Sequence, residues 1–253
     1  MLEICAIASG SNGNCYYIGN RADAVLIDAG ISTKQILLRM KERGLNPAKI
    51  KALFITHEHS DHMRGARVFG KKLQVPVYMT AKTYNSSYKN LRPDYPKFFS
   101  PEETIEVGDF SIHPVLKNHD AAEPCSFRIE YRNRNIGVFT DIGEACNNVK
   151  THLQLCDSLF LESNYDEKML WEGNYPWHLK KRVASEVGHL SNTQAYDLLH
   201  QHAGDKLQCV FLSHISKENN TPEIALTTMQ PLTERFTVKL ASRYEASEVF
   251  QLQ

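Results

Sequence analysis

The sequence predicts an α/β protein whose two halves repeat one pattern. Short apolar runs rich in β-branched and aromatic residues, typical of buried strands, alternate with segments of helical character. Each half has a strand that ends in Asp with Gly two positions later, and a later strand that ends in a hydroxyl residue followed by His; these segments are residues 24–30, 53–57, 136–143 and 209–214. No linker rich in Pro, Gly or Ser separates the halves. We therefore expect a single domain, 1–253, with interlocked halves of about 1–100 and 101–253 and with the four strand ends at one rim.

The elements of the first half follow from local patterns. Strands at 2–7 and 15–18 enclose a loop of Gly, Ser and Asn, which is either an ordinary turn or a set of backbone and hydroxyl donors for an anion. Further strands are expected at 24–27, 52–55 and 75–78, with helices at 33–43 and 62–72. Gly44 is expected to end the first helix as a left-handed cap residue. Residues 84–100 favour a helix followed by a loop.

The second half begins with strands. These are expected at 104–107, 110–116, 125–131 and 136–141, with a later strand at 209–213. Between them, Ser191 and Gln194 have the spacing of a capping box and precede a helical pattern.

Composition limits the class of protein. The chain has 253 residues, 42% of them hydrophobic, which is enough for a sizeable core. Lys+Arg and Asp+Glu both number 29, so any binding of nucleic acid needs a local basic patch. The six cysteines are scattered without a CxxC pair and indicate reduced, mostly buried thiols. With no membrane span or signal segment in sight, we expect a cytoplasmic protein without a membrane partner.

A histidine-rich motif follows the strand at 52–55. It reads His57-Glu58-His59-Ser60-Asp61-His62. In an extended chain alternate side chains point the same way, so His57, His59 and Asp61 should converge, and His62 should join them from the start of the next helix. Imidazole and carboxylate donors suit Zn, Mn or Fe. The alternative is a solvated polar turn that happens to be rich in His.

Three further candidate ligands follow strands in the second half. They are His119, Asp141 and His214. Taken singly, each has an ordinary alternative: a structural histidine, a turn carboxylate or a hydrogen-bonded core histidine. Their matching positions at strand ends favour a shared site.

These residues resemble the motifs of the metallo-β-lactamase fold superfamily, and they occur in the same order. The resemblance implies a four-layer αββα sandwich with two divalent metal ions at its rim. One ion would be held by His57, His59 and His119, and the other by Asp61, His62 and His214. Asp141 would bridge the two ions, and Asp28 would orient a ligand rather than bind metal.

Two adjacent cations would supply the chemistry of a hydrolase. They lower the pKa of a shared water, and they can clamp the attacking and leaving oxygens of a displacement at phosphorus. Asp61 would thus serve catalysis as well as metal binding, and no Ser or Cys nucleophile is needed. The fold alone does not choose between esters, thioesters, lactones and phosphodiesters.

The segment Gly188-His189-Leu190-Ser191-Asn192 bears on this choice. It is either an ordinary helix start with an incidental His, or it places His189 at a helix N-terminus that favours a phosphate. A similar loop occurs in the nuclease branches of the superfamily, where the resemblance implies that the His assists the leaving group.

Basic and aromatic residues at 175–182 suggest a track for nucleic acid. The alternative is a solvated helix face with Trp177 tucked inward. Together with the polar loops, this gives the residues expected to contact substrate: Ser11, Asn12, Asn14, Asn164, His178, Lys180, Arg182, Ser191 and Asn192.

Over nearly its full length the chain resembles the compact bacterial YycJ/WalJ group of this superfamily. The resemblance implies a 5′→3′ DNA exonuclease of DNA repair. One departure is Tyr165, where the group has His, and this affects substrate contacts rather than metal ligands.

Two other functions compete with this one. One is a glyoxalase- or lactonase-type hydrolase of small esters or thioesters. Against it, the sequence shows no helical C-terminal substrate domain, and the 188–192 loop would have no purpose. A regulatory or redox protein would need either lost ligands or an electron-carrier domain, and neither is found in the sequence. No oligomeric state is predicted.

Overall fold

The computed structural model describes residues Met1–Leu252, which form two seven-stranded sheets. The first sheet has the order β14-β1-β2-β3-β4-β5-β6, with β1 Leu2–Ala8, β2 Cys15–Gly19, β3 Ala24–Ile27, β4 Ile50–Phe54, β5 Val77–Met79, β6 Pro96–Phe98 and β14 Phe250–Leu252. The second has the order β13-β12-β11-β10-β9-β8-β7, with β7 Ile105–Val107, β8 Phe110–Leu116, β9 Cys125–Tyr131, β10 Arg134–Phe139, β11 Ser158–Glu162, β12 Cys209–Ser213 and β13 Thr237–Leu240.

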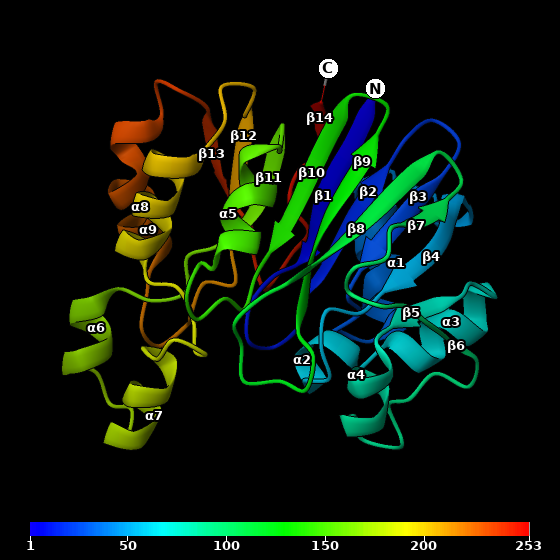
Figure 1. The fold of residues 1–253 in the computed structure, drawn as a ribbon, viewed down its shortest axis with the longest axis horizontal. Helices are drawn as coiled ribbons and strands as arrows, with labels where there is room; N and C mark the ends of the chain where they lie inside the picture. The colour runs from blue at the N-terminus through cyan, green and yellow to red at the C-terminus, as the bar shows by residue number, and fades with distance from the viewer. Residues whose placement is uncertain (253) are drawn as a thin grey trace.

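Helices cover the outer faces of the two sheets, and others lie beyond the strand ends (Figure 1). Those of the first half are α1 Thr33–Glu42, the 3₁₀ turn η1 Pro47–Lys49, α2 Ser60–Met63, α3 Ala66–Leu73 and α4 Ala81–Ser86. Those of the second half are α5 Asn147–Gln154, α6 Glu167–Glu172, α7 Trp177–Val183, α8 Asn192–His202, α9 Pro222–Met229 and η2 Gln230–Leu232.

Three apolar cores separate four layers. Alternation along β3 shows why, because Val25 and Ile27 face the second sheet while Ala24 and Leu26 face the helices of the first half. A strand buried on both faces reads as a continuous apolar run, which is how this strand was recognisable in the sequence. The third core packs α5, α8 and α9 on the outer face of the second sheet. The predicted four-layer αββα sandwich is confirmed.

The last strand of the second half, β14, belongs to the sheet of the first half. β14 pairs antiparallel with β1, aligning Leu2 with Leu252, so the chain termini lie together at the end of the molecule opposite α2 (Figure 1). This pairing interlocks the two halves.

Two local predictions are wrong. The helix expected at 62–72 is two helices, and His62 is the third residue of α2 rather than the opening residue of the helix. The break falls at Gly65, whose N–H donates to the Ala29 carbonyl and where an added Cβ would lie 2.3 Å from the carbonyl oxygen of Ile31. The segment 84–100 contains a strand, β6, in addition to the end of α4 and a loop.

All six cysteines are free, and five of them are buried. This agrees with the thiols expected from the sequence. Among residues Met1–Leu252, no helix combines the length and the apolar character needed to cross a membrane.

Candidate metal centre

Seven predicted ligands converge on the rim where the strands of both sheets end. His57 and His59 lie in the loop after β4, and Asp61 and His62 lie on α2. The second half supplies His119 from the β8–β9 loop, Asp141 after β10 and His214 after β12. The sequence predicted that alternation along an extended chain would bring His57, His59 and Asp61 together. This is correct for the two histidines only, because the extended chain ends before Ser60 and helix α2 positions Asp61 and His62.

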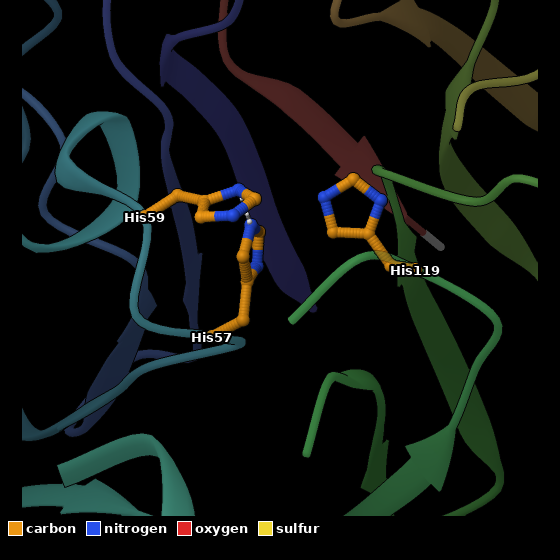
Figure 2. Close-up of side chains that lie close together, drawn as sticks. All are labelled: His57, His59 and His119. Atoms are coloured by element: carbon orange, nitrogen blue, oxygen red, sulfur yellow. Dashed lines mark hydrogen bonds between the residues drawn. The ribbon is translucent and has the colours of Figure 1, made fainter. Parts of the chain in front are cut away.

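Three of the histidines form the first cluster. The candidate ligand atoms of His57, His59 and His119 all lie within 4.8 Å of one another (Figure 2). The Nε2 atom of His57 is 3.1 Å from the Nδ1 atom of His59, so these two rings point at each other. Their arrangement matches one half of the ligand set that the resemblance implies.

A second cluster joins Asp61, His62 and His214, again within 4.8 Å. The carboxylate of Asp141 lies between the clusters. One of its oxygens is 3.2 Å from Nε2 of His62, and the other is 4.0 Å from Nε2 of His119. Asp141 can therefore contribute to both.

Unpartnered buried atoms show that this cavity fits cations. Nine buried side-chain atoms of the described residues have no hydrogen-bond partner, and three of them lie at this centre: Nε2 of His119, Nε2 of His214 and Oδ2 of Asp141, which makes no hydrogen bond although Nε2 of His62 lies 3.2 Å away. Leaving such a group unsatisfied costs about 1–3 kcal/mol, and bound cations would remove this cost at the three atoms of the centre. All three atoms belong to the predicted ligand set, and His and Asp donors suit Zn, Mn or Fe.

Most of these histidines are fixed by a hydrogen bond to the ring nitrogen that faces away from the centre. Asp28 Oδ2 lies 2.7 Å from Nδ1 of His62, and the hydroxyl of Thr56 lies 2.9 Å from Nδ1 of His57. The Gly188 carbonyl accepts from Nδ1 of His119 at 3.1 Å. Such contacts fix the ring and the tautomer and direct Nε2 toward the centre.

The electrostatics of the centre favour positive charge. Burial lowers the pKa of His119 to about 3, so this imidazole is neutral and able to act as a ligand. Burial alone would also lower the pKa of His214, but Asp141, Asp61 and Glu162 together raise it to about 10. The carboxylates thus create a negative potential that a bound cation would also satisfy.

Three residues at the rim have an unusual backbone conformation. Asp28, Asp141 and His214 have φ values of 62°, 54° and 55°, in the left-handed region that non-glycine residues rarely adopt. Two glycines beside them allow close contact between loops. An added Cβ on Gly30 would lie 1.6 Å from the Asp61 carbonyl oxygen, and one on Gly143 would lie 2.2 Å from the Glu186 carbonyl oxygen. The repeated Asp-x-Gly pattern therefore marks equivalent turns.

Replacing Gly30 by alanine should separate the loops that meet at the rim. Because the new Cβ would collide with backbone rather than with a movable side chain, we expect the free energy of unfolding to fall by about 3 kcal/mol or more. Gly44→Ala is the control, since its φ of 69° costs about 1–2 kcal/mol but its Cβ meets open space. Urea unfolding of both variants measures the difference, and equal losses would contradict the collision.

Glu162 has a role at this centre that is not evident from the sequence. This carboxylate is fully buried at the end of β11. Its Oε1 accepts from Nδ1 of His214 at 2.8 Å and from Nδ1 of His189 at 2.9 Å, while Oε2 accepts from the N–H groups of Ile142 and Leu190. Burial alone would raise the pKa of Glu162, but His189 and His214 bring it to about 2. Glu162 therefore positions a predicted ligand and the candidate catalytic histidine at once.

A hollow of about 240 Å³ opens beside the centre. The substrate candidates that line it are Ser11, Asn164, Arg182 and His189. Arg182 is also hydrogen-bonded to Asp120 at 2.6 Å, so its charge is partly neutralised.

The remaining substrate candidates lie elsewhere. Asn14 is buried with its amide 3.2 Å from Nε2 of His62, and Asn192 is buried against Ser163 and Asn220. Ser191 caps α8, forming the predicted capping box. These three polar side chains make hydrogen bonds within the rim, so contact with a substrate is not needed to explain them.

The basic segment at 175–182 also differs from expectation. Lys180 is buried, and its ammonium group donates to the Trp171 carbonyl at 2.7 Å, which leaves it unavailable to a phosphate. His178 is exposed and does not line the hollow, and neither does Asn12. Trp177 is 62% exposed rather than tucked inward.

Tyr165, where the sequence departs from the group's pattern, packs in a small core with Leu170 and Val183. It therefore has a structural explanation.

The similarity to a known family bears on the two interpretations of the His57 to His62 motif, as metal ligands or as a solvated polar turn. A family model described as the metallo-beta-lactamase superfamily matches residues 8–214. The chain belongs to the metallo-beta-lactamase superfamily. The seven predicted ligands described above all lie within the matched residues.

Two curated relatives place the chain more narrowly, in the YycJ/WalJ-type group. The chain is 34% identical over 236 residues to the exodeoxyribonuclease YycJ of Bacillus anthracis, covering 92% of this chain and 89% of that protein. It is 34% identical over 228 residues to the exodeoxyribonuclease WalJ of Streptococcus pneumoniae, covering 88% and 85%. The superfamily fold is also shared with the solved YhfI structure from Bacillus subtilis, with a TM-score of 0.73 at 17% identity, over 98% of this chain and all of that one.

Proposed function

We propose that this protein is a metal-dependent exodeoxyribonuclease that degrades DNA in the 5′→3′ direction and serves DNA repair. The observation that carries the proposal is the similarity over most of the chain to two relatives named exodeoxyribonucleases. The site supports the proposal, because the seven predicted ligands lie together and three of them have a buried atom without a hydrogen-bond partner. Acting on chromosomal DNA would place the protein in the cytoplasm, as the six free cysteines also favour.

We propose two divalent ions, Zn, Mn or Fe, held as the resemblance implies. His57, His59 and His119 would hold one, Asp61, His62 and His214 the other, and Asp141 would contact both. When bound, such ions supply a nucleophile from water at neutral pH and neutralise charge on a phosphate.

His189 is the candidate proton donor. Its Nδ1 is held by Glu162, and the residue lines the hollow beside the centre. Because Nδ1 is engaged, Nε2 is the nitrogen left to deliver a proton to the oxygen that leaves phosphorus. Glu162 would stabilise the positive charge of the ring before that transfer.

Replacing His189 by alanine should lower kcat on DNA about 10²- to 10⁴-fold, because a positioned acid contributes that much. If the ions are held by the two predicted three-residue clusters, metal content should not change; a loss of metal would show instead that His189 is a ligand, together with Asp141, Glu162 and His214. His200→Ala is the matched control, being an exposed histidine on α8 that stacks on Tyr196. A His189→Ala protein with full metal content and full nuclease rate would remove the proposed role.

A substrate comparison tests the proposal as a whole. The purified protein with Mn or Zn is offered a phosphodiester, a lactone and a thioester under the same conditions. We expect turnover of the phosphodiester and of DNA, with little of the other two. Metal-dependent turnover of a lactone or thioester without cleavage of DNA would favour a small-molecule hydrolase instead.

A further inference from the structure

One stretch of the chain carries an excess of positive charge although the protein as a whole is neutral. Residues 64–98 contain eight Lys or Arg and one Asp, whereas the whole chain has 29 residues of each sign. This stretch comprises α3, β5, α4 and β6. Together with α2, these elements lie at one side of the rim in Figure 1, across from α6 and α7.

Some of these charges have structural partners. Arg67 pairs with Asp94 at 2.9 Å, and Lys82 pairs with Glu123 at 2.7 Å. Arg92 donates to the carbonyls of Asn85 and Ser87. The Lys82–Glu123 pair ties α4 to the β8–β9 loop that also carries His119, so the basic stretch adjoins the candidate metal centre.

Four lysines of this stretch make no salt bridge within residues 1–252, although the ammonium group of Lys97 lies 5.7 Å from the centre of the Tyr78 ring. Lys71, Lys72, Lys89 and Lys97 are exposed, and within the described part of the chain no carboxylate oxygen lies within 4.0 Å of their ammonium groups. A local excess of lysines without carboxylate partners is the electrostatic footprint of a polyanion.

Exposed aromatic rings stand among these lysines. Tyr95 is 91% exposed, Tyr88 69% and Phe98 53%. Tyr95 forms part of the wall of two hollows, one of about 600 Å³ that also includes Lys71 and Lys97, and one of about 430 Å³ that also includes Lys89. An almost fully exposed ring between two lysine-lined hollows gains nothing from core packing, but it offers a stacking platform with cations on either side.

We propose that this surface, which we call the Tyr95 surface (Lys71, Lys89, Tyr95 and Lys97), binds the single-stranded part of the DNA substrate away from the scissile phosphate. The proposal rests on the proposed nuclease function and adds the place where the strand is gripped. Charge complementarity points to a polyanion, and the exposed rings point to one with unpaired bases, since bases within a duplex are already stacked. The same basic stretch meets the loop that carries His119 through the Lys82–Glu123 pair, so a strand held at the Tyr95 surface would continue along α4 toward the metal centre.

The test measures binding of a labelled single-stranded oligonucleotide of about 20 residues by fluorescence anisotropy, at several salt concentrations. For Lys89→Gln/Lys97→Gln we expect Kd to rise about fivefold to tenfold and the slope of log K against log[salt] to fall by about 1.4, the value for two phosphate contacts on a single strand. Tyr95→Ala should raise Kd about fivefold or more, because a stacked base is lost.

The matched control is Arg21→Gln/Arg132→Gln. It also removes two exposed positive charges, but from the turns between β2 and β3 and between β9 and β10, at the end opposite the rim. Its Kd should stay near that of the unaltered protein. Equal weakening by both double variants would show an effect of net charge and would overturn the proposal, as would unchanged binding by the lysine variant and Tyr95→Ala.

A second readout separates this proposal from the proposed function. On a dinucleotide, which reaches the centre but not the Tyr95 surface, the lysine variant and Tyr95→Ala should turn over at the unaltered rate. If the unaltered protein cleaves DNA and the variants cleave long single strands equally well, the Tyr95 surface is refuted while the function stands. If the unaltered protein neither binds nor cleaves DNA but an acidic peptide binds to this surface, both proposals fail.

Discussion

Asp141→Asn is expected to lower the nuclease rate about a thousandfold or more. Asp141 is 2% exposed, lies between the two ligand clusters and has one oxygen without a partner. An amide has no negative charge to share between cations, and several kcal/mol of charge stabilisation would be lost. Asparagine tolerates the left-handed backbone at this position, so the fold should persist. Rates on linear DNA and bound metal by elemental analysis are measured together, and both should fall.

Asp205→Asn serves as the control for this substitution, because Asp205 is exposed and far from the rim in the chain's second half. It should retain both metal and rate. An Asp141→Asn protein that kept its metal content and its rate would show that Asp141 does not belong to the centre.

Glu162→Gln should impair the centre without removing a predicted ligand. The carboxylate accepts four hydrogen bonds, from two histidines and two backbone N–H groups, and an amide can accept on its oxygen alone. In the variant, the donors that face the amide nitrogen lose their acceptor, and each such loss costs about 1–3 kcal/mol. We therefore expect both a lower free energy of unfolding and a rate lowered about 10²-fold. Urea unfolding of the metal-free protein and rates on DNA measure the two effects.

The rate loss has a signature that a purely structural role would lack. If Glu162 positions His189, then adding Glu162→Gln to His189→Ala should lower the rate little further, because both changes disable one unit. Glu172→Gln, on the exposed end of α6, is the control. Additive losses in the double variant would show that the two residues act separately.

Much of the site could be predicted because its ligands follow strands. The His57 to His62 motif is compact, and the Asp-x-Gly pattern after β3 and β10 predicts equivalent turns. In the structure both aspartates of this pattern have a left-handed backbone conformation. Glu162 ends the buried strand β11 at the same rim, and the argument applied to Asp141 applies to it as well. It was missed because its role lies in contacts with His189 and His214, which are distant in sequence.

Other features depended on contacts that no local pattern records. The break between α2 and α3 is set by the carbonyls of Ala29 and Ile31 against Gly65, so helix periodicity alone favoured one continuous helix. Lys180 belongs to a basic run, and only its hydrogen bond to Trp171 shows that its charge is engaged. The Tyr95 surface likewise emerges from tertiary structure, because its lysines and rings come from helix, loop and strand.

The measurement that tests the central claim most directly is degradation of 5′-phosphorylated linear DNA by the purified protein with added Mn or Zn. An Asp61→Ala/His62→Ala protein, which loses two predicted ligands of one cluster, is the control. We predict progressive loss of nucleotides from the 5′ end by the unaltered protein and none by the control. Intact DNA with every metal tested, or equal degradation by the control protein, would contradict the assignment of this centre to a DNA exonuclease.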